Sequence, residues 1–229
     1  MPRGLTRLPT LLAAAALVGV LATGCAEEAA AVRVGDRTLS DNDLIDEAGY
    51  IYDNTTLWDL VDEQNGQPEG TSRSSLAGDA PGSYSQQFVA SVLQQRVTFL
   101  LVDELYEQEG EPITDQDRAA ATQAQTQQFG DAFEDFPESY QDQLIDEYSR
   151  LVSLQASLGD EDFNTKILEL IDSTDVEISS RYGTWDADVF RSAPDQPAIV
   201  PPVGPTPPAG SEDVAELDAE FAPNSGAGG

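Results

Sequence analysis

The stretch from Tyr84 to Gln108 constrains the fold more than any other part of the sequence. It contains no Gly or Pro, and its first half places apolar residues on one side at helical spacing. From Val97 to Val102 the apolar residues point to every side of a helix. Such a helix must be enclosed, and six residues cannot span a bilayer, which needs about 20. We therefore expect a long central helix enclosed by a mainly α-helical domain.

The composition excludes several classes of function. The 229-residue chain has a formal net charge of −31, one Cys and no His. A phosphate backbone requires a positive surface, so nucleic acid is not an expected partner. Without His, neither Ser-His-Asp nor Cys-His catalysis nor imidazole ligation of a metal is possible. We therefore predict a protein that is not an enzyme, with no metal and no cofactor.

Carboxylates are too numerous for any pair or cluster of them to be singled out as a site. Asp and Glu number 42, and the cluster within residues 131–138 is of a size that such a composition produces by chance. The favoured interpretation is a solvated surface of an exported protein, and adaptation to a salty medium is the rival. A cation or ligand sensor is kept as a third functional hypothesis.

Residues 1–24 have the pattern of an export signal, with a positive start followed by an apolar run. Small residues directly precede Cys25, and this arrangement resembles the lipobox of bacterial lipoproteins. The resemblance implies cleavage after Gly24 and a diacylglycerol on the sulfur of Cys25, with residues 25–31 as a tether. We expect an exported protein of the cell envelope, lipid-anchored to the outer face of the membrane. The alternative is an ordinary signal peptide with an incidental cysteine.

Residues 32–187 are expected to form the folded body. Short alternating segments on either side of Gly35-Asp36 predict a β-hairpin. Val176–Ser179 alternates as a strand should, and its natural partner is the hairpin. The two ends of the domain would then meet in a small β element.

Helices are predicted between these two β segments. Ser40 is expected to cap a helix that continues to Asn65, and a loop rich in Gly, Ser and Pro follows over residues 64–82. After the central helix, Thr114 is a predicted cap for an outer helix of mostly Ala and Gln. Pro137 opens the next helix, and a shorter amphipathic one follows it.

Residues 188–229 differ in character from the rest. They are rich in Pro, Gly, Ala and acidic residues and show almost no periodicity. Such a segment cannot bury enough apolar surface to offset its ordering entropy. We predict a disordered C-terminal tail.

The layout resembles the N-terminal chaperone domain of the SurA and PrsA foldases. The segments that carry the resemblance are Val32–Leu44, Leu93–Glu111, Ile113–Asp117 and Val176–Trp185. In those foldases a parvulin prolyl-isomerase domain typically accompanies the helical part, and its site characteristically uses a pair of histidines. This chain has no His and only about 45 residues after Trp185. The resemblance therefore implies a SurA-like polypeptide-binding module without isomerase activity.

Large aromatic side chains are the candidates for contacts with polypeptide clients, because non-specific binding requires adaptable apolar contact. The alternative, that most of them belong to an ordinary core, is weighed beside this one. The candidate residues are Phe88, Phe129, Phe133, Tyr140, Tyr182 and Trp185.

Two functional hypotheses from different classes lead. The first is a membrane-anchored, extracytoplasmic, chaperone-like lipoprotein that binds unfolded or secreted polypeptides. The second is a scaffold or assembly lipoprotein with one dedicated partner protein in the envelope.

Overall fold

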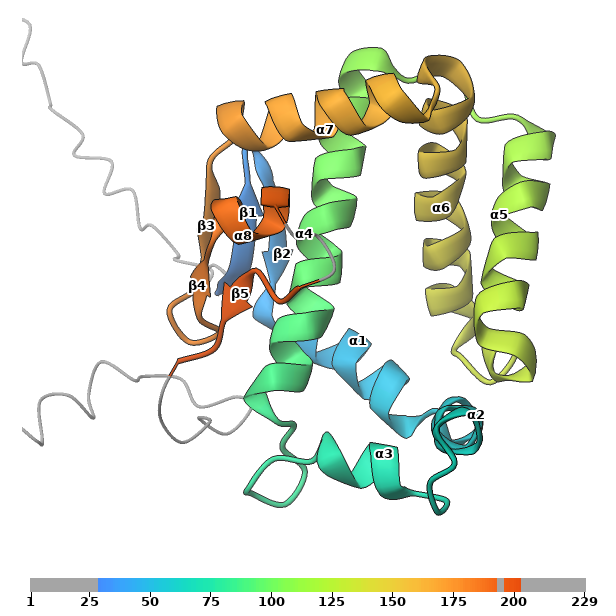
Figure 1. Cartoon of the computed structure of the whole chain (residues 1–229), viewed down its shortest axis with the longest axis vertical. Helices are drawn as coiled ribbons and strands as arrows, with labels where there is room; N and C mark the ends of the chain where they lie inside the picture. Colours follow the sequence, from blue (N-terminus) through green and yellow to red (C-terminus); the bar gives the residue numbers. More distant parts are fainter. Residues whose placement is uncertain (1–28, 193–195, 203–229) are drawn as a thin grey trace, which may run out of the picture.

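The computed structural model describes residues 29–192 and 196–202, which form a mainly helical domain with a small antiparallel sheet (Figure 1). At this level the expected fold class is confirmed. The predicted signal segment 1–24 and Cys25 lie outside the described residues. Within the described ranges, every helix is too short or too polar to span a bilayer.

A three-stranded sheet joins the two ends of the domain. β1 (Ala30–Val34) lies in the middle, with β2 (Arg37–Ser40) on one side and β3 (Val176–Ile178) on the other, and both pairings are antiparallel. The predicted hairpin and its pairing with the closing strand are confirmed. β1 starts at Ala30, inside the segment 25–31 that was assigned to the tether.

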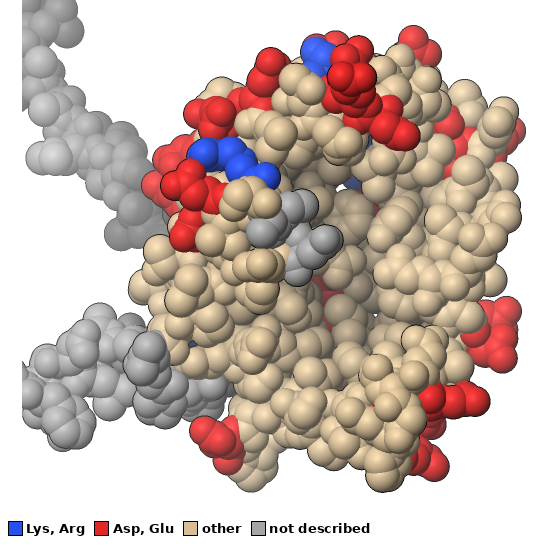
Figure 2. Space-filling model, in the orientation of Figure 1, with Lys and Arg blue, Asp and Glu red and all other residues tan. Residues whose placement is uncertain are grey.

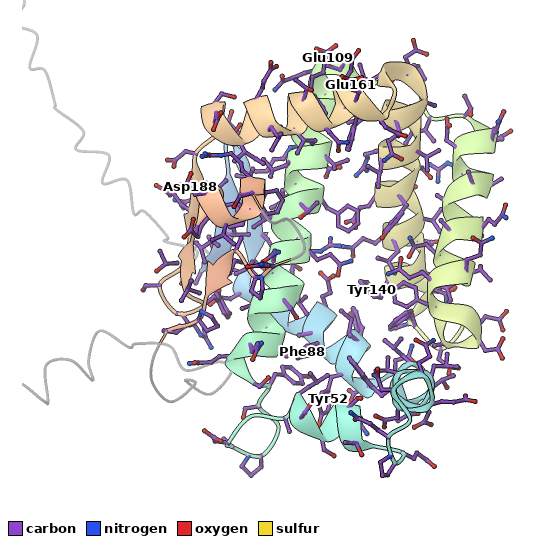
Figure 3. All side chains as sticks on the ribbon, viewed as in Figure 1. Tyr52, Phe88, Glu109, Tyr140, Glu161 and Asp188 are labelled. Atoms are coloured by element: carbon purple, nitrogen blue, oxygen red, sulfur yellow. The ribbon has the colours of Figure 1, made fainter. Side chains whose placement is uncertain are left out.

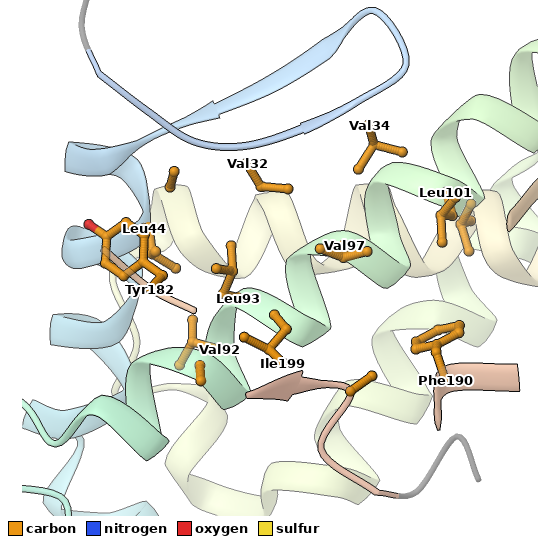
Figure 4. Packing of buried hydrophobic residues seen from close by; sticks show 14 of the residues in the cluster. Val32, Val34, Leu44, Val92, Leu93, Val97, Leu101, Tyr182, Phe190 and Ile199 are labelled. Carbon is orange, nitrogen blue, oxygen red and sulfur yellow. The ribbon is translucent and has the colours of Figure 1, made fainter. Parts of the chain in front are cut away.

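α4 (Gln86–Glu109) is the predicted central helix. The sheet, α1 (Asp41–Asp53), α6 (Glu138–Leu158) and α7 (Asp160–Ser173) all pack against it (Figure 1). Its apolar side chains form one large core with those of β1, α1, α7 and the C-terminal segment (Figure 4). Protein therefore encloses this helix, as its sequence requires.

The first helix differs from its prediction, because it ends at Asn54 and a second helix, α2 (Thr55–Asn65), starts there. The Asn54 side chain accepts a hydrogen bond from the Leu57 backbone N at 3.0 Å and so caps α2. It also donates from Nδ2 to the Ala132 carbonyl at 2.7 Å, in the 3-10 helix η1 (Gly130–Phe133). This contact between segments far apart in sequence sets where the chain turns, and helical periodicity does not reveal it.

The predicted loop 64–82 contains one short helix, α3 (Thr71–Ser75). Asp62, on α2, accepts hydrogen bonds from the backbone N of Ser72 at 2.9 Å and of Thr71 at 3.0 Å. The Ser72 side chain, and with it these backbone bonds, lowers the pKa of the Asp62 carboxyl. The carboxylate thereby joins α3 to α2.

α5 (Asp115–Phe129) packs against α6 on the outside of the domain, as predicted. Thr114 and Asp117 form a capping box at its start, which confirms the predicted cap. Ala121 and Gln125 are its only buried residues, so most of this Ala- and Gln-rich helix faces solvent.

The C-terminal segment departs from the prediction of a disordered tail starting at residue 188. Residues there form α8 (Ala187–Ser192) and β5 (Ile199–Val200), and β5 pairs antiparallel with β4 (Thr184–Trp185). Phe190 and Ile199 are buried in the main core. This burial offsets the conformational entropy cost of ordering the segment, which from composition alone was expected to keep it disordered. Residues 203–229 lie outside the described part of the chain.

Replacing Asn54 with Ala removes both the cap of α2 and the hydrogen bond to Ala132. Because Asn54 is buried, we expect the free energy of unfolding to fall by about 2 kcal/mol. Urea denaturation measures this. The matched control is Asn65→Ala at the exposed end of the same helix, which should change stability by less than about 0.5 kcal/mol. Equal effects of the two substitutions would contradict the conclusion that Asn54 holds the junction of α1 and α2 against η1.

Candidate functional site

A groove of about 570 Å³ lies between α4 and the C-terminal segment. α4 contributes a stripe of polar side chains at helical spacing, and residues from 196 to 201 form the opposite wall. The remaining lining is Ala, Pro and Ile. The polar side chains along it are Gln87, Ser91, Gln94, Gln95, Thr98 and Gln196.

The groove differs from the rest of the protein in charge. Charged residues make up 23% of the chain, yet none of the described residues that line the groove is charged. In Figure 2 most of the carboxylates on this face lie toward its periphery. A ligand in the groove therefore meets uncharged hydrogen-bonding groups rather than carboxylates.

The Gln94 side chain holds an extended segment of the chain by its backbone. Its Nε2 donates to the Gln196 carbonyl at 3.1 Å, and its Oε1 accepts from the Ala198 N at 2.6 Å. The Ala198 carbonyl accepts from the Asp186 N at 2.8 Å. The Gln94 amide thus forms hydrogen bonds with backbone groups on one side of the segment. The Asp186 N–H, directly after β4, donates to the segment on the other side.

The apolar side chains of the same segment enter the core. Ala198 and Ile199 are fully buried, and Ile199 points toward α4, in one cluster with Val92 and Leu93 (Figure 4). Gly183 makes this approach possible, because a Cβ there would lie 2.2 Å from the Val200 carbonyl oxygen. The arrangement is a small apolar socket beside a backbone-binding amide.

The contacts that hold the segment are few. β5 pairs with β4 over two residues, and Gln94 binds the backbone of the segment at two points. Burial of Ala198 and Ile199 adds the apolar part of the contact.

A second candidate feature is a buried ionic group between α1, α4 and α6. Arg96 binds Glu147 through both terminal nitrogens, at 2.6 and 2.7 Å, and its Nε lies 2.8 Å from Glu47 Oε2. The Tyr140 hydroxyl donates to Glu47 Oε1 at 3.0 Å. All four side chains are buried, and two carboxylates share one guanidinium.

Burial raises the pKa of Glu47 to about 7, and the Glu147 carboxylate adds to the rise while Arg96 opposes it. Burial and the nearby Glu47 carboxylate raise the pKa of the Tyr140 hydroxyl. Near neutral pH the group therefore holds a proton on Glu47 in part of the molecules. Arg96 and Glu147 then form a neutral pair.

A cavity of about 340 Å³ opens beside Glu47 and Tyr140. Asp43, Asp46 and Tyr50 also line it, so its wall is acidic, unlike that of the groove. Within residues 29–192 and 196–202, no cluster of three or more His, Cys, Asp or Glu side chains is arranged to hold a metal ion.

The predicted aromatic residues lie in the core rather than along the groove. Phe129, Phe133 and Tyr140 belong to a second cluster at the α5–α6 turn, whereas Phe88, at the start of α4 (Figure 3), belongs to the main core. Tyr182 is buried in the main core, and Trp185 packs on the Phe190 ring at 5.0 Å. The structure thus divides these candidates between two clusters.

The open apolar face that the aromatic residues suggested is not found in the described part of the chain. Only two large apolar side chains are exposed there, Leu168 at 42% and Val200 at 58%. Val200 lies on β5 next to the groove. The apolar socket beside the groove is the one that Ile199 fills beneath β5.

The sequence analysis missed the polar stripe on α4. Gln87, Ser91, Gln94 and Thr98 recur at intervals of three or four residues, which places them on one face of a helix. A run of uncharged polar residues at this spacing was the available signal in so acidic a chain.

Comparisons of the chain with protein-family models, with curated proteins and with solved structures found no match.

Arg96→Met leaves two carboxylates buried without their cation, and we expect it to lower the free energy of unfolding by about 3–5 kcal/mol at pH 8. The matched control is Arg33→Met, which breaks an exposed pair with Glu177 and should cost less than about 1 kcal/mol. Urea denaturation at this pH compares the two variants. Similar losses would show that the buried group does not hold the helices together.

Glu47→Gln replaces the carboxyl whose pKa is raised and keeps a side-chain oxygen that can accept from the Tyr140 hydroxyl. Between the ordinary pKa of 4.5 and the folded value of about 7, the folded protein retains a proton that the unfolded chain releases. The contribution of Glu47 to stability is therefore largest at low pH and is lost as pH rises through this window. We expect the free energy of unfolding of the wild type, relative to Glu47→Gln, to fall by about 3 kcal/mol across it. A difference that stays constant with pH would contradict the raised pKa.

Proposed function

We propose that this protein is an exported lipoprotein, anchored to the outer face of the cell membrane through Cys25, that binds unfolded or secreted polypeptides without catalysing a reaction on them. The observation that carries the proposal is the extended segment held on α4 by Gln94, beside an uncharged groove. The same geometry is available to any extended chain, because backbone groups do not depend on sequence.

The order of the elements supports the same proposal. A hairpin runs into a helix, a long buried helix follows, and a closing strand returns to the hairpin. We propose on this order that the domain is of the SurA N-terminal type, acting as a chaperone-like module without an isomerase.

The charge distribution supports binding of many polypeptides rather than of one charged ligand. Carboxylates elsewhere keep the protein soluble and repel non-specific acidic partners. The uncharged groove removes that repulsion where a polypeptide backbone would lie. Weak, adaptable contacts of this kind suit a binder of diverse segments.

A direct test is suppression of the aggregation of a reduced, unfolded model protein by the full-length chain. We expect aggregation to fall at equimolar concentration, and no effect at several-fold molar excess contradicts the proposal. Cross-linking in intact cells distinguishes the alternative: many cross-linked clients support a chaperone-like role, whereas one stoichiometric partner indicates a dedicated scaffold.

Gln95→Glu places a carboxylate in the groove. An extended uncharged segment bound there would bury part of that charge, so we expect affinity for the unfolded model protein to fall about tenfold. Fluorescence anisotropy measures the dissociation constant. Gln127→Glu, on the exposed face of α5, adds the same charge outside the groove and should leave the affinity within about twofold. Equal losses in both variants would indicate that net charge, not the groove, governs binding.

A further inference from the structure

Residues 196–200, which line the groove opposite α4, indicate what kind of segment α4 and β4 can hold. We infer that an extended, uncharged aliphatic segment of a client takes the place of residues 196–200, so that this segment is a built-in competitor for the site. The inference rests on the proposed function and specifies its ligand and its regulation.

The first argument is the backbone geometry. Gln94 binds a carbonyl and an N–H two residues apart on one edge of the segment. β4 binds the other edge, with Thr184 opposite Val200 and Trp185 opposite Ile199. A client strand presents the same groups at the same spacing, so it can be held at both edges without any change in α4 or β4.

The second argument is the side-chain socket. Ala198 and Ile199 are buried and Val200 is exposed, so the site takes a small residue followed by a branched aliphatic one. Residues 196–202 carry no charge, and neither does the described lining of the groove. A segment with Asp or Glu at the Ile199 position would have to lose its hydration in an apolar socket.

Few backbone hydrogen bonds hold the segment against β4. β5 is two residues long, and Pro197 and Pro201 flank it. Proline has no backbone N–H, so the ladder cannot extend past these positions. Release of this short strand uncovers the apolar socket, which the described surface otherwise keeps closed.

A reversible lock tests the inference. Thr184 and Val200 are exposed Cα partners in an antiparallel pair, and such pairs are spaced about 4.5–5.5 Å apart, within the range that a disulfide bridges. We would introduce Thr184→Cys and Val200→Cys into a Cys25→Ser chain, which removes the single native cysteine. The probes are a model protein reduced and alkylated with a neutral reagent, and a labelled peptide Gln-Pro-Ala-Ile-Val-Pro-Pro.

We expect the oxidised, locked chain to bind both probes at least tenfold more weakly than the same chain after reduction, because locking removes the binding-competent population. The peptide with Asp in place of its Ile should not bind either form. Equal affinity of the locked and reduced chains for the unfolded protein overturns the inference and leaves the proposed function standing. If the wild-type chain does not bind the unfolded protein at all, the proposed function itself fails.

Discussion

Burial of the apolar residues of α4 is the constraint on which the rest of the structure depends. Apart from its polar stripe, this helix is apolar and needs cover, and the sheet, α1, α6 and α7 supply most of it. Ile199 on β5 covers the side near Val92 and Leu93 (Figure 4). This part of the cover is a two-residue strand, and the Gln94 side chain binds the residues just before it. The requirement that builds the core thus also places a two-residue strand beside the groove.

Long side chains join α4 to two of the helices packed against it. Arg96 reaches Glu147 on α6 and Glu47 on α1, and the Phe99 and Tyr148 rings meet at 5.4 Å. A buried ion pair adds little net stability once its desolvation is counted. The ion pair instead fixes the positions of three helices relative to one another, because Arg96 on α4 contacts both α6 and α1.

Local chemistry made much of the fold predictable, and long-range contacts account for the failures. The caps at Ser40 and Thr114 and the pairing of β1 with β3 follow from short patterns. The break at Asn54 depends on Ala132, 78 residues away, and no periodicity encodes it. The predicted site residues were aromatic, but core packing uses those rings. The face of α4 that we propose binds polypeptide carries Gln, Ser and Thr side chains. Their helical spacing is visible in the sequence, whereas the segment that lies opposite them is not.

By itself, the sequence determined that a long apolar helix must be enclosed, that the chain has no histidine-based chemistry, and that its surface is acidic. Those conclusions follow from composition and period, which act locally along the chain. Only the tertiary structure decided that residues from a Pro-rich C-terminal segment return to α4 and that Gln94 binds their backbone. The reason is physical: hydrogen bonds and burial between segments about 100 residues apart depend on where the whole domain brings them, and a local pattern carries no information about that distance.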